Sequence, residues 1–500
     1  MSTDLHHEEK ISSKNITFTQ ALLPILFLLA LIVYGLILRP QLFAQPAFPL
    51  EIIFILAAVF AVGEQFVLGF GWEDIQRSIV AKLARALPAF FILFAIGIII
   101  SSWIVSGTIP MLVYYGLKII NPTFLYLLAF LVPVIFSSLT GTSWGSAGTI
   151  GVVIIGIAIT LEADLGITAG AIIGGAYFGD KMSPLSDTTN LAALATDVDL
   201  FDHIRSMMYT TVPSATLAAI IYLMLGFIYP PQINSSDLTS ITPFLESLEA
   251  IFDFNILLLL PPLIVLLGSL KKKPTIPTLL TSVLIAAALG LIFQRFTVAD
   301  VVQSLYKGFH SDMAVWIEVV PERVATLVNR GGLYALNDSI VIAFMVFIFI
   351  GAIDHINAMP IVVNRIFRFA KTRASAIISS LLATAFTNAL TSNQYATSFI
   401  VGDAFKSKYD ALKIPRKVLS RSLEDAGTML ENIVPWTTTA VFMVATLGVP
   451  VSEYWHWQLL SLINFVVAPL LAILGIGCFY NEVNRADKNL KEISGNFTIL

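Results

Sequence analysis

Residues 174–190, GGAYFGDKMSPLSDTTN, interrupt an otherwise apolar region with three charged side chains, Asp180, Lys181 and Asp187. One charge at the centre of a membrane-spanning helix costs about 2.5–3.5 kcal/mol, so three charges beside one break need a compensating purpose. Pro184 lacks a backbone donor and breaks the helix. We therefore expect a discontinuous membrane span here, whose polar interruption is buried in protein or lines a cavity.

The composition of the whole chain is typical of a membrane protein. Of the 500 residues, 57% are hydrophobic and 12% are charged, and the mean hydropathy is +0.83. One soluble core of this length could not bury so many apolar residues. We expect one integral membrane domain with the lipid bilayer as its main partner, no enzyme domain and no nucleic-acid partner. The single cysteine, Cys478, excludes an internal disulfide and makes a structural zinc site implausible.

Apolar stretches long enough to cross a bilayer core, about 20 residues, recur along the chain. They lie near residues 18–38, 50–70, 87–105, 209–229, 254–270, 275–296, 334–356 and 456–478. Residues 123–196 and 374–448 are also apolar, but polar clusters interrupt them. These clusters are SSLTGTSWGSAGT (137–149), GDKMSPLSDTTN (179–190), TNALTSNQYATS (387–398) and LENIVPWTTT (430–439). Broken backbone at membrane depth indicates hairpins and discontinuous helices.

Loop charge predicts the topology, because short cytoplasmic loops collect Lys and Arg. Three loops carry such clusters: Lys271, Lys272 and Lys273; Arg365, Arg368, Lys371 and Arg373; and Lys406, Lys408, Lys413, Arg416, Lys417 and Arg421. Residues 231–253 carry acids, Asp237 among them, and no Lys or Arg, which favours the outside. Two cytoplasmic loops flank residues 374–402, so this segment must be a re-entrant hairpin. By the same count of membrane crossings between loops, residues 123–162 form a hairpin that enters from outside.

A constant offset in sequence indicates an internal repeat. Pro110 and Pro360 are 250 residues apart, as are Phe136 and Phe386. The pairs Asp180 and Glu431, Pro184 and Pro435, and Thr188 and Thr439 are 251 apart. Five spans per half make the second half inverted and place both termini in the cytoplasm, an architecture found in many secondary transporters.

The predicted fold is therefore an all-α polytopic membrane protein with an inverted-topology repeat, about ten spans, two re-entrant hairpins and two discontinuous helices. The discontinuous helices cover residues 167–200 and 417–448. The expected organisation is a cytoplasmic N-terminal tail (1–17), a first repeat (18–230), an external loop (231–253), an inverted second repeat (254–480) and a cytoplasmic C-terminal tail (481–500).

Oxygen-bearing side chains after the break at Pro184 predict a cation site, because hard cations such as sodium prefer oxygen ligands. We expect sodium at Asp187, Thr188 and Asn190. Further cation-binding residues are expected in the same cluster and at the hairpin tips: Thr142, Ser143, Ser186, Ser392 and Asn393. The alternative is that Asp180 and Lys181 pair with each other while Ser186 or Asp187 merely caps a helix.

Proton coupling is expected at Asp180, Lys181 and Glu431, charged residues that precede the two breaks. Buried carboxylates near a break are suited to alternate between protons and cations. Glu424 and Asp425 follow Arg421 closely, so a solvated ion-pair role and a functional role both remain open for them.

Four stretches of the chain resemble NhaC-type sodium/proton antiporters. They are AGAIIGGAYFGDKMSPLSDTTNLA (169–192), TGTSWGSAGTIG (140–151), TSNQY (391–395) and SRSLEDAGTMLENIVPWTTTAVFMVATLGV (420–449), and the likeness covers most of residues 70–450. The residues that fall on the family motifs are Asp180, Lys181, Ser183, Pro184, Asp187, Thr188, Thr189, Asn190, Asn393 and Glu424. The chain departs from the pattern at Glu431, Asn432 and Thr437.

The resemblance implies a bacterial inner-membrane antiporter with inverted repeats and paired hairpins, which takes sodium as a substrate and needs no cofactor. Sodium- or proton-coupled exchange of small carboxylates or amino acids is the alternative, because the family also includes exchangers of malate for lactate. An ion channel fits the internal repeat poorly, since channels usually place one polar path on an oligomer axis. A homodimer is compatible with the sequence.

Overall fold

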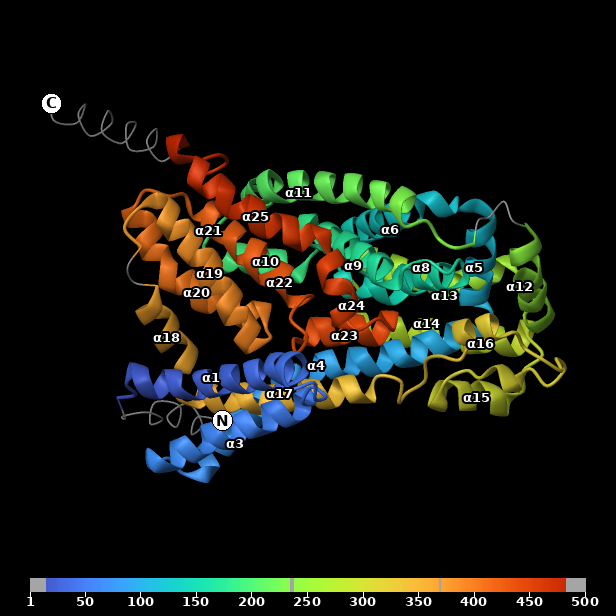
Figure 1. The fold of residues 1–500 in the computed structure, drawn as a ribbon, viewed down its shortest axis with the longest axis horizontal. Helices are drawn as coiled ribbons and strands as arrows, with labels where there is room; N and C mark the ends of the chain where they lie inside the picture. The colour runs from blue at the N-terminus through green and yellow to red at the C-terminus, as the bar shows by residue number, and fades with distance from the viewer. Residues whose placement is uncertain (1–14, 234–237, 368–369, 483–500) are drawn as a thin grey trace.

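The computed structural model describes residues 15–233, 238–367 and 370–482, and within these ranges every regular element is a helix (Figure 1). Most of the two expected tails, residues 1–14 and 483–500, lies outside the described residues, as do Asp237 and Arg368. Within the described chain, nine helices are long and apolar enough to cross a membrane, or up to eleven if each bent pair counts as one span. This confirms the prediction of an all-α polytopic membrane protein.

The first half of the chain contains eleven α-helices. They are α1 (Phe18–Ile32), α2 (Arg39–Leu42), α3 (Leu50–Val67), α4 (Trp72–Val105), α5 (Thr108–Ile119), α6 (Leu125–Thr140), α7 (Ser143–Ser146), α8 (Val152–Thr160), α9 (Leu165–Met182), α10 (Asp187–Ala195) and α11 (Leu200–Ile228). Two π-helical segments, Val33–Leu38 and Ala147–Gly151, continue α1 and α7.

The second half begins after α12 (Leu238–Ile251), a helix within the segment expected to be the external loop. Its helices are α13 (Leu260–Leu270), α14 (Thr275–Phe293), α15 (Val298–Lys307), α16 (Glu322–Val328), α17 (Asn337–His355), α18 (Ala358–Ile366), α19 (Arg373–Thr391), α20 (Gln394–Ala411), α21 (Arg416–Leu423), α22 (Met429–Glu431), α23 (Thr438–Leu447), α24 (Val451–Tyr454) and α25 (Leu459–Leu474). A π-helical segment, Glu424–Thr428, joins α21 to α22.

Several helix boundaries differ from the predicted spans. Helix α4 begins 15 residues before the predicted span 87–105, because its polar first half packs on the end of α17. There Ser78 Oγ donates to Gly351 O (2.8 Å) and Lys82 Nζ lies 2.5 Å from Asp354 Oδ2. A search for apolar stretches misses such an extension, since polar contacts hold it.

Both predicted hairpins reverse direction through a left-handed residue. The residue that caps the C-terminus of α6 is Gly141 (φ 69°). The residue that caps α19 is Ser392 (φ 49°), 251 positions later. The next residue is the N-cap of the returning helix in each hairpin, Thr142 in one and Asn393 in the other. Gly107 and Asn357, which are 250 residues apart, are likewise left-handed and start α5 and α18. The repeat predicted from sequence offsets thus recurs in backbone geometry.

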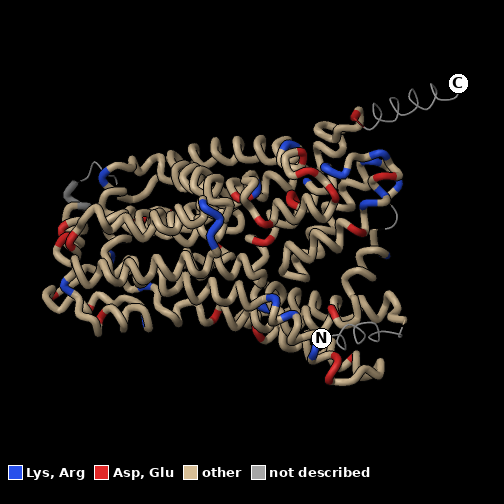
Figure 2. The backbone as a smooth tube through the Cα atoms, turned by 180° about the vertical axis from the view of Figure 1, so that it is seen from behind, with Lys and Arg blue, Asp and Glu red and all other residues tan. Residues whose placement is uncertain are grey.

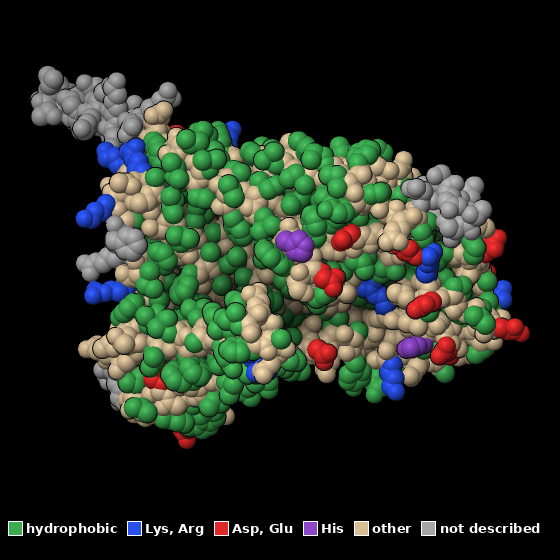
Figure 3. Space-filling model, viewed as in Figure 1, with side chains coloured by type: hydrophobic (Ala, Val, Ile, Leu, Met, Phe, Trp, Pro, Cys, Tyr) green, Lys and Arg blue, Asp and Glu red, His purple; other side chains and the backbone are tan. Residues whose placement is uncertain are grey.

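The two hairpins lie towards opposite ends of the molecule. Figure 1 shows α19 and α20 with α18 and α21 at the left end, and α8 with α5 and α12 towards the right end. Apolar side chains cover most of the face in Figure 3, as expected for a surface in contact with lipid. Opposite placement of equivalent hairpins agrees with the inverted repeat.

Glycines in the stretch 174–190 bring α9 against the first hairpin. A Cβ on Gly175 would lie 2.0 Å from Phe130 O, and one on Gly179 would lie 2.4 Å from Ser138 N. Only a residue without a side chain allows this close approach of α9 to α6. The contact places Asp180, the next residue, beside the hairpin tip.

Candidate functional site

Each hairpin tip packs against the break in the discontinuous helix of its own repeat. A Cβ on Gly141 would lie 2.6 Å from Leu185 Cβ, inside the first break. In the second repeat, Thr438 N donates to Ser392 Oγ (2.8 Å). The two halves also meet directly, because Trp144 stacks on Phe442 with ring centroids 4.3 Å apart. Figure 2 marks acidic and basic residues in the middle part of the molecule as well as at its ends.

Asp180 is buried beside the first hairpin tip. Its side chain is 7% exposed, and Ser143 Oγ donates to its Oδ2 (2.8 Å). The structure thus joins two of the residues expected at the site, one from the hairpin and one from the discontinuous helix. The hydroxyl donor stabilises the ionised carboxylate in a setting that holds little water.

One interpretation of the sequence expected Lys181 to pair with Asp180, and the structure shows that it does not. Its Nζ contacts Oδ1 of Asp425, and the two side chains are 0% and 1% exposed. Successive residues of a helix point about 100° apart, so Asp180 and Lys181 face different neighbours. Lys181 therefore links the discontinuous helix of the first repeat to that of the second.

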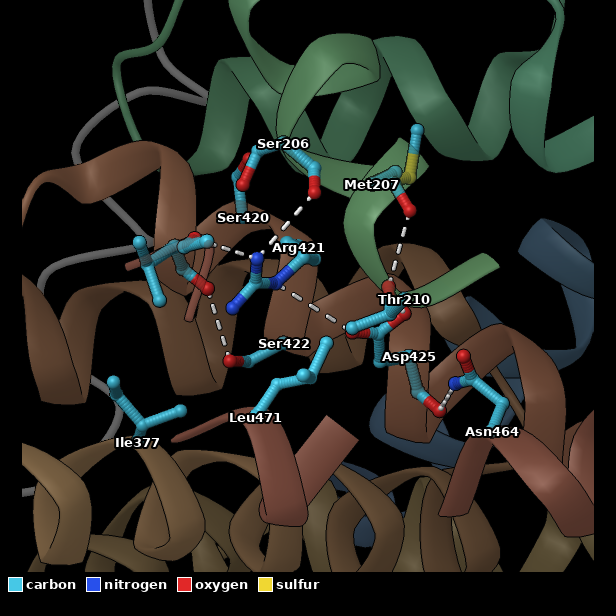
Figure 4. Close-up of polar contacts among 12 residues, drawn as sticks. Ser206, Met207, Thr210, Ile377, Ser420, Arg421, Ser422, Asp425, Asn464 and Leu471 are labelled. Atoms are coloured by element: carbon cyan, nitrogen blue, oxygen red, sulfur yellow. Dashed lines mark hydrogen bonds and ion pairs between the residues drawn. The ribbon is translucent and has the colours of Figure 1, made fainter. Parts of the chain in front are cut away.

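Asp425 has further partners on three helices (Figure 4). Thr210 Oγ1 of α11 donates to Asp425 Oδ1 (2.9 Å), and Asn464 Nδ2 of α25 donates to its backbone oxygen (3.0 Å). Arg421 Nε of α21 lies 3.7 Å from Asp425 Oδ2. Two cations, Lys181 and Arg421, and one hydroxyl donor, Thr210, thus compensate the charge of this carboxylate.

A solvated ion pair at Arg421, Glu424 and Asp425 is ruled out, because all three side chains are buried. Arg421 Nη1 donates to Gly477 O (2.8 Å) and to Ser206 O (3.4 Å), which fixes the guanidinium inside the protein. The π-helical segment Glu424–Thr428 follows directly. Such segments widen a helix locally and occur often at functional sites.

Glu431 is buried as expected and accepts hydrogen bonds from two side chains of its own repeat. Asn388 Nδ2 donates to its Oε1 (3.1 Å) and Thr439 Oγ1 donates to its Oε2 (3.1 Å). The glutamate is 8% exposed. Asn388 also donates to Gln394 Oε1 (2.7 Å), so the hairpin tip and the second break share one network.

Glu424 differs from the other buried acids. Its side chain is 0% exposed, and neither carboxylate oxygen has a hydrogen-bond partner among the described residues. The charge of Lys181 and the hydroxyl of Thr428 favour its ionised form, whereas the charges of Asp180 and Glu431 oppose it. An isolated buried carboxylate is strongly unfavourable unless a positive charge or a proton joins it.

Several residues expected to bind the cation make local contacts in this conformation. Ser186 Oγ accepts from Thr189 N (3.4 Å) and is the N-cap of α10, as the capping interpretation predicted. Asn190 Nδ2 donates to Ser186 O (2.6 Å), and Thr188 Oγ1 lies 3.1 Å from Ser186 Oγ. Asp187 and Asn190 are exposed, whereas Asp180 is buried. The predicted ligands therefore divide into an exposed set and a buried set.

Sequence reasoning missed part of the buried network. Thr210 and Asn464 lie in predicted spans, 209–229 and 456–478, that contain no Asp, Glu, Lys or Arg, and no local signal singles them out. The spacing of Arg421 and Asp425, four residues apart on one helix face, was a usable signal. Within the described ranges, no group of three or more His, Cys, Asp or Glu side chains is arranged to hold a metal ion.

Comparisons with known proteins agree with this geometry. Residues 175–476 match the family model described as "Na+/H+ antiporter family". The chain is 40% identical to an uncharacterized Na+/H+ antiporter of Haemophilus influenzae, over 92% of this chain and 97% of that protein. It is 35% identical to the Na+/H+ antiporter NhaC of Alkalihalophilus pseudofirmus (87% and 91% covered). It is 32% identical to the malate-2H+/Na+-lactate antiporter of Bacillus subtilis (84% and 89% covered). The chain therefore belongs to the NhaC family of Na+/H+ antiporters, a family of transporters and not of enzymes.

Proposed function

We propose that this protein exchanges sodium ions for protons across the inner membrane of a bacterium, with both termini in the cytoplasm. The observation that carries the proposal is the group of buried carboxylates where the hairpin tips meet the broken helices: Asp180, Glu424 and Glu431. Lys181 and Arg421 lie in the same region, but both are directed at Asp425. The other three acids leave the site with an excess of negative charge that suits cations and protons.

The exchange follows from the cost of burying an uncompensated carboxylate. Such a group is favourable only with a proton or a bound cation, so sodium and protons compete for the same negative charge. Rocking of the two repeats would expose the loaded site to one side of the membrane at a time. Sodium is the substrate in this scheme, and no cofactor is needed.

The proposed residue roles keep the division seen in the structure. Asp187, Thr188 and Asn190 receive sodium at the exposed end of α10, and oxygens of the hairpin tips and the N-cap complete its ligands: Thr142, Ser143, Ser186, Ser392 and Asn393. Asp180, Lys181 and Glu431 take part in proton coupling. Asp180 and Asp187 lie within electrostatic range of each other, which allows the charge of one to affect the other.

Exchange of a small carboxylate is the alternative, because one relative is named a malate-2H+/Na+-lactate antiporter. A carboxylate substrate needs a cationic partner in the site. Lys181 contacts Asp425, while Arg421 faces Asp425 and donates to backbone carbonyls. The charge balance therefore favours a cation as the substrate.

Transport in proteoliposomes tests the proposal. Liposomes that contain the purified protein and a pH-sensitive dye receive a sodium pulse outside, and the lumen should become alkaline as sodium enters and protons leave. A lumen pH that does not respond to sodium contradicts the proposal. A response that requires malate or lactate supports the alternative. Native mass spectrometry of the same preparation tests the homodimer that we include in the proposal.

A further inference from the structure

We propose that Glu424 is the carboxylate that a sodium ion and a proton occupy in turn during exchange. This inference rests on the proposed function and specifies it, because sequence reasoning had assigned the exchange to Asp180, Glu431 and the residues near Asp187. The geometry of the buried acids adds Glu424 to these residues, as the group at which the two ions replace each other.

The four buried acids of the site have different partners. Ser143 donates to Asp180, and Asn388 and Thr439 donate to Glu431. Lys181 and Thr210 contact Asp425. These partners already stabilise the ionised forms of three acids. Glu424, although fully buried, has no hydrogen-bond partner at either oxygen among the described residues.

Three buried oxygens on the π-helical segment and on the helix that packs against it also lack a hydrogen-bond partner among the described residues. Thr428 Oγ1 lies one turn after Glu424 on the π-helical segment, and Asn388 Oδ1 and Thr387 Oγ1 lie on α19, which packs against that segment. All three side chains are buried. Hydroxyl and amide oxygens can coordinate a hard cation beside a carboxylate, and the two hydroxyls can also donate to that carboxylate. The surroundings of Glu424 thus fit a monovalent cation such as sodium.

Local contacts bring the tip of the second hairpin against the π-helical segment that carries Glu424. Gln394 Nε2 donates to Leu423 O (2.9 Å), the carbonyl just before Glu424. A Cβ on Gly427 would lie 2.1 Å from Gln394 Oε1, so the glycine lets the hairpin tip approach the π-helical segment. Gln394 Oε1 also accepts from Asn388 Nδ2 (2.7 Å). This bond fixes the amide of Asn388, whose own oxygen, Oδ1, has no partner among the described residues. The hairpin tip therefore positions oxygens near Glu424.

The exchange step is balanced without any further reactant. When sodium arrives, the O–H bond of the protonated Glu424 breaks, the proton passes to water, and the carboxylate that remains coordinates sodium. When sodium leaves, the carboxylate takes a proton from water on the other side of the membrane. The charge at Glu424 is the same in both loaded states, which makes either state compatible with burial.

Sodium binding to the purified protein in detergent tests the inference. For the wild type, binding of radioactive sodium should release protons into a weakly buffered solution. Glu424→Gln should bind sodium at least about tenfold more weakly, a loss of roughly 1.4 kcal/mol, and should release no proton. Glu424→Asp should keep both responses at reduced affinity. Glu453→Gln, at an exposed position of α24, is the control and should match the wild type.

A measurement on the wild type avoids any loss of folding in the variants. A hydrophobic carbodiimide, which reacts with protonated buried carboxyls, should label Glu424, and sodium should protect it; mass spectrometry of peptides reads the site. Labelling that sodium does not change, or a folded Glu424→Gln with wild-type sodium affinity, overturns the inference. If the wild type binds sodium at Glu424 but does not move protons across liposomes, the proposed function fails and the site stands.

Discussion

Lys181 and Asp425 form a buried ion pair between residues 244 positions apart, one in each repeat. The pair joins the discontinuous helix of the first repeat to that of the second at membrane depth. Both side chains are sealed from solvent, so Lys181 depends on Asp425 for charge compensation, while Asp425 has Arg421 as a second, more distant cation. This contact links the two halves of the exchange site.

Loss of one partner of this pair should destabilise the protein strongly. Lys181→Met alone and Asp425→Leu alone each leave a buried charge without its partner, and we expect a loss of about 3–5 kcal/mol for each. The double variant should recover much of that loss, because neither charge remains. Thermal unfolding in detergent measures all three, and additive losses would contradict the coupling.

Asp187→Asn should fold normally and lose sodium-driven pH change in proteoliposomes. Folding should survive because Asp187 is exposed and makes no ion pair within the described residues. Transport should be lost because the change removes a negative charge from the proposed sodium ligands. Normal transport by this variant would remove Asp187 from the site.

The apparent sodium affinity of the wild type should improve as pH rises, until the site is fully deprotonated. Protons and sodium compete for the same carboxylates, so acidification must weaken sodium binding by reciprocal linkage. Asp180→Asn and Lys181→Gln test whether these two residues carry the competition. If both variants keep the wild-type pH dependence, the proton path runs elsewhere in the site.

Gly179→Ala should separate α9 from α6 and impair both stability and transport. The added Cβ would lie 2.4 Å from Ser138 N, a backbone atom that cannot yield without moving the hairpin. Overpacking of this kind costs about 1–3 kcal/mol. Gly63→Ala, where the added Cβ meets nothing within 4 Å, is the matched control. It should be neutral or stabilising by up to about 1 kcal/mol, and unfolding temperatures compare the two.

The topology can be tested at residue 410, in the segment 403–416 that we expect on the cytoplasmic side. Asp410→Cys in a Cys478→Ser background gives a protein with one thiol, because Cys478 is the only native cysteine. A membrane-impermeant maleimide should label this thiol only when the reagent can reach the cytoplasmic side of the membrane. Asp410 is about half exposed, so the thiol should be accessible. Labelling from outside would overturn the inverted topology.

The broken helices and hairpins were predictable because their signals are local. Pro184 and Pro435 interrupt apolar stretches, and a glycine or a short polar residue marks each hairpin tip, as at Gly141 and Ser392. A missing backbone donor, or a residue that tolerates a left-handed conformation, acts within a few positions of the chain. The cap at Ser186 belongs to the same class of local chemistry.

By itself, the sequence determined the membrane location, the two re-entrant hairpins, the two discontinuous helices and the repeat that relates them. The tertiary structure alone decided that Lys181 pairs with Asp425, that Arg421 is buried, and that Glu424 lacks the donors that the other acids have. The physical reason is the separation along the chain over which each interaction acts. Hydropathy, proline breaks and caps depend on neighbours along the chain, whereas the partner of a buried charge depends on which helices two distant repeats bring together.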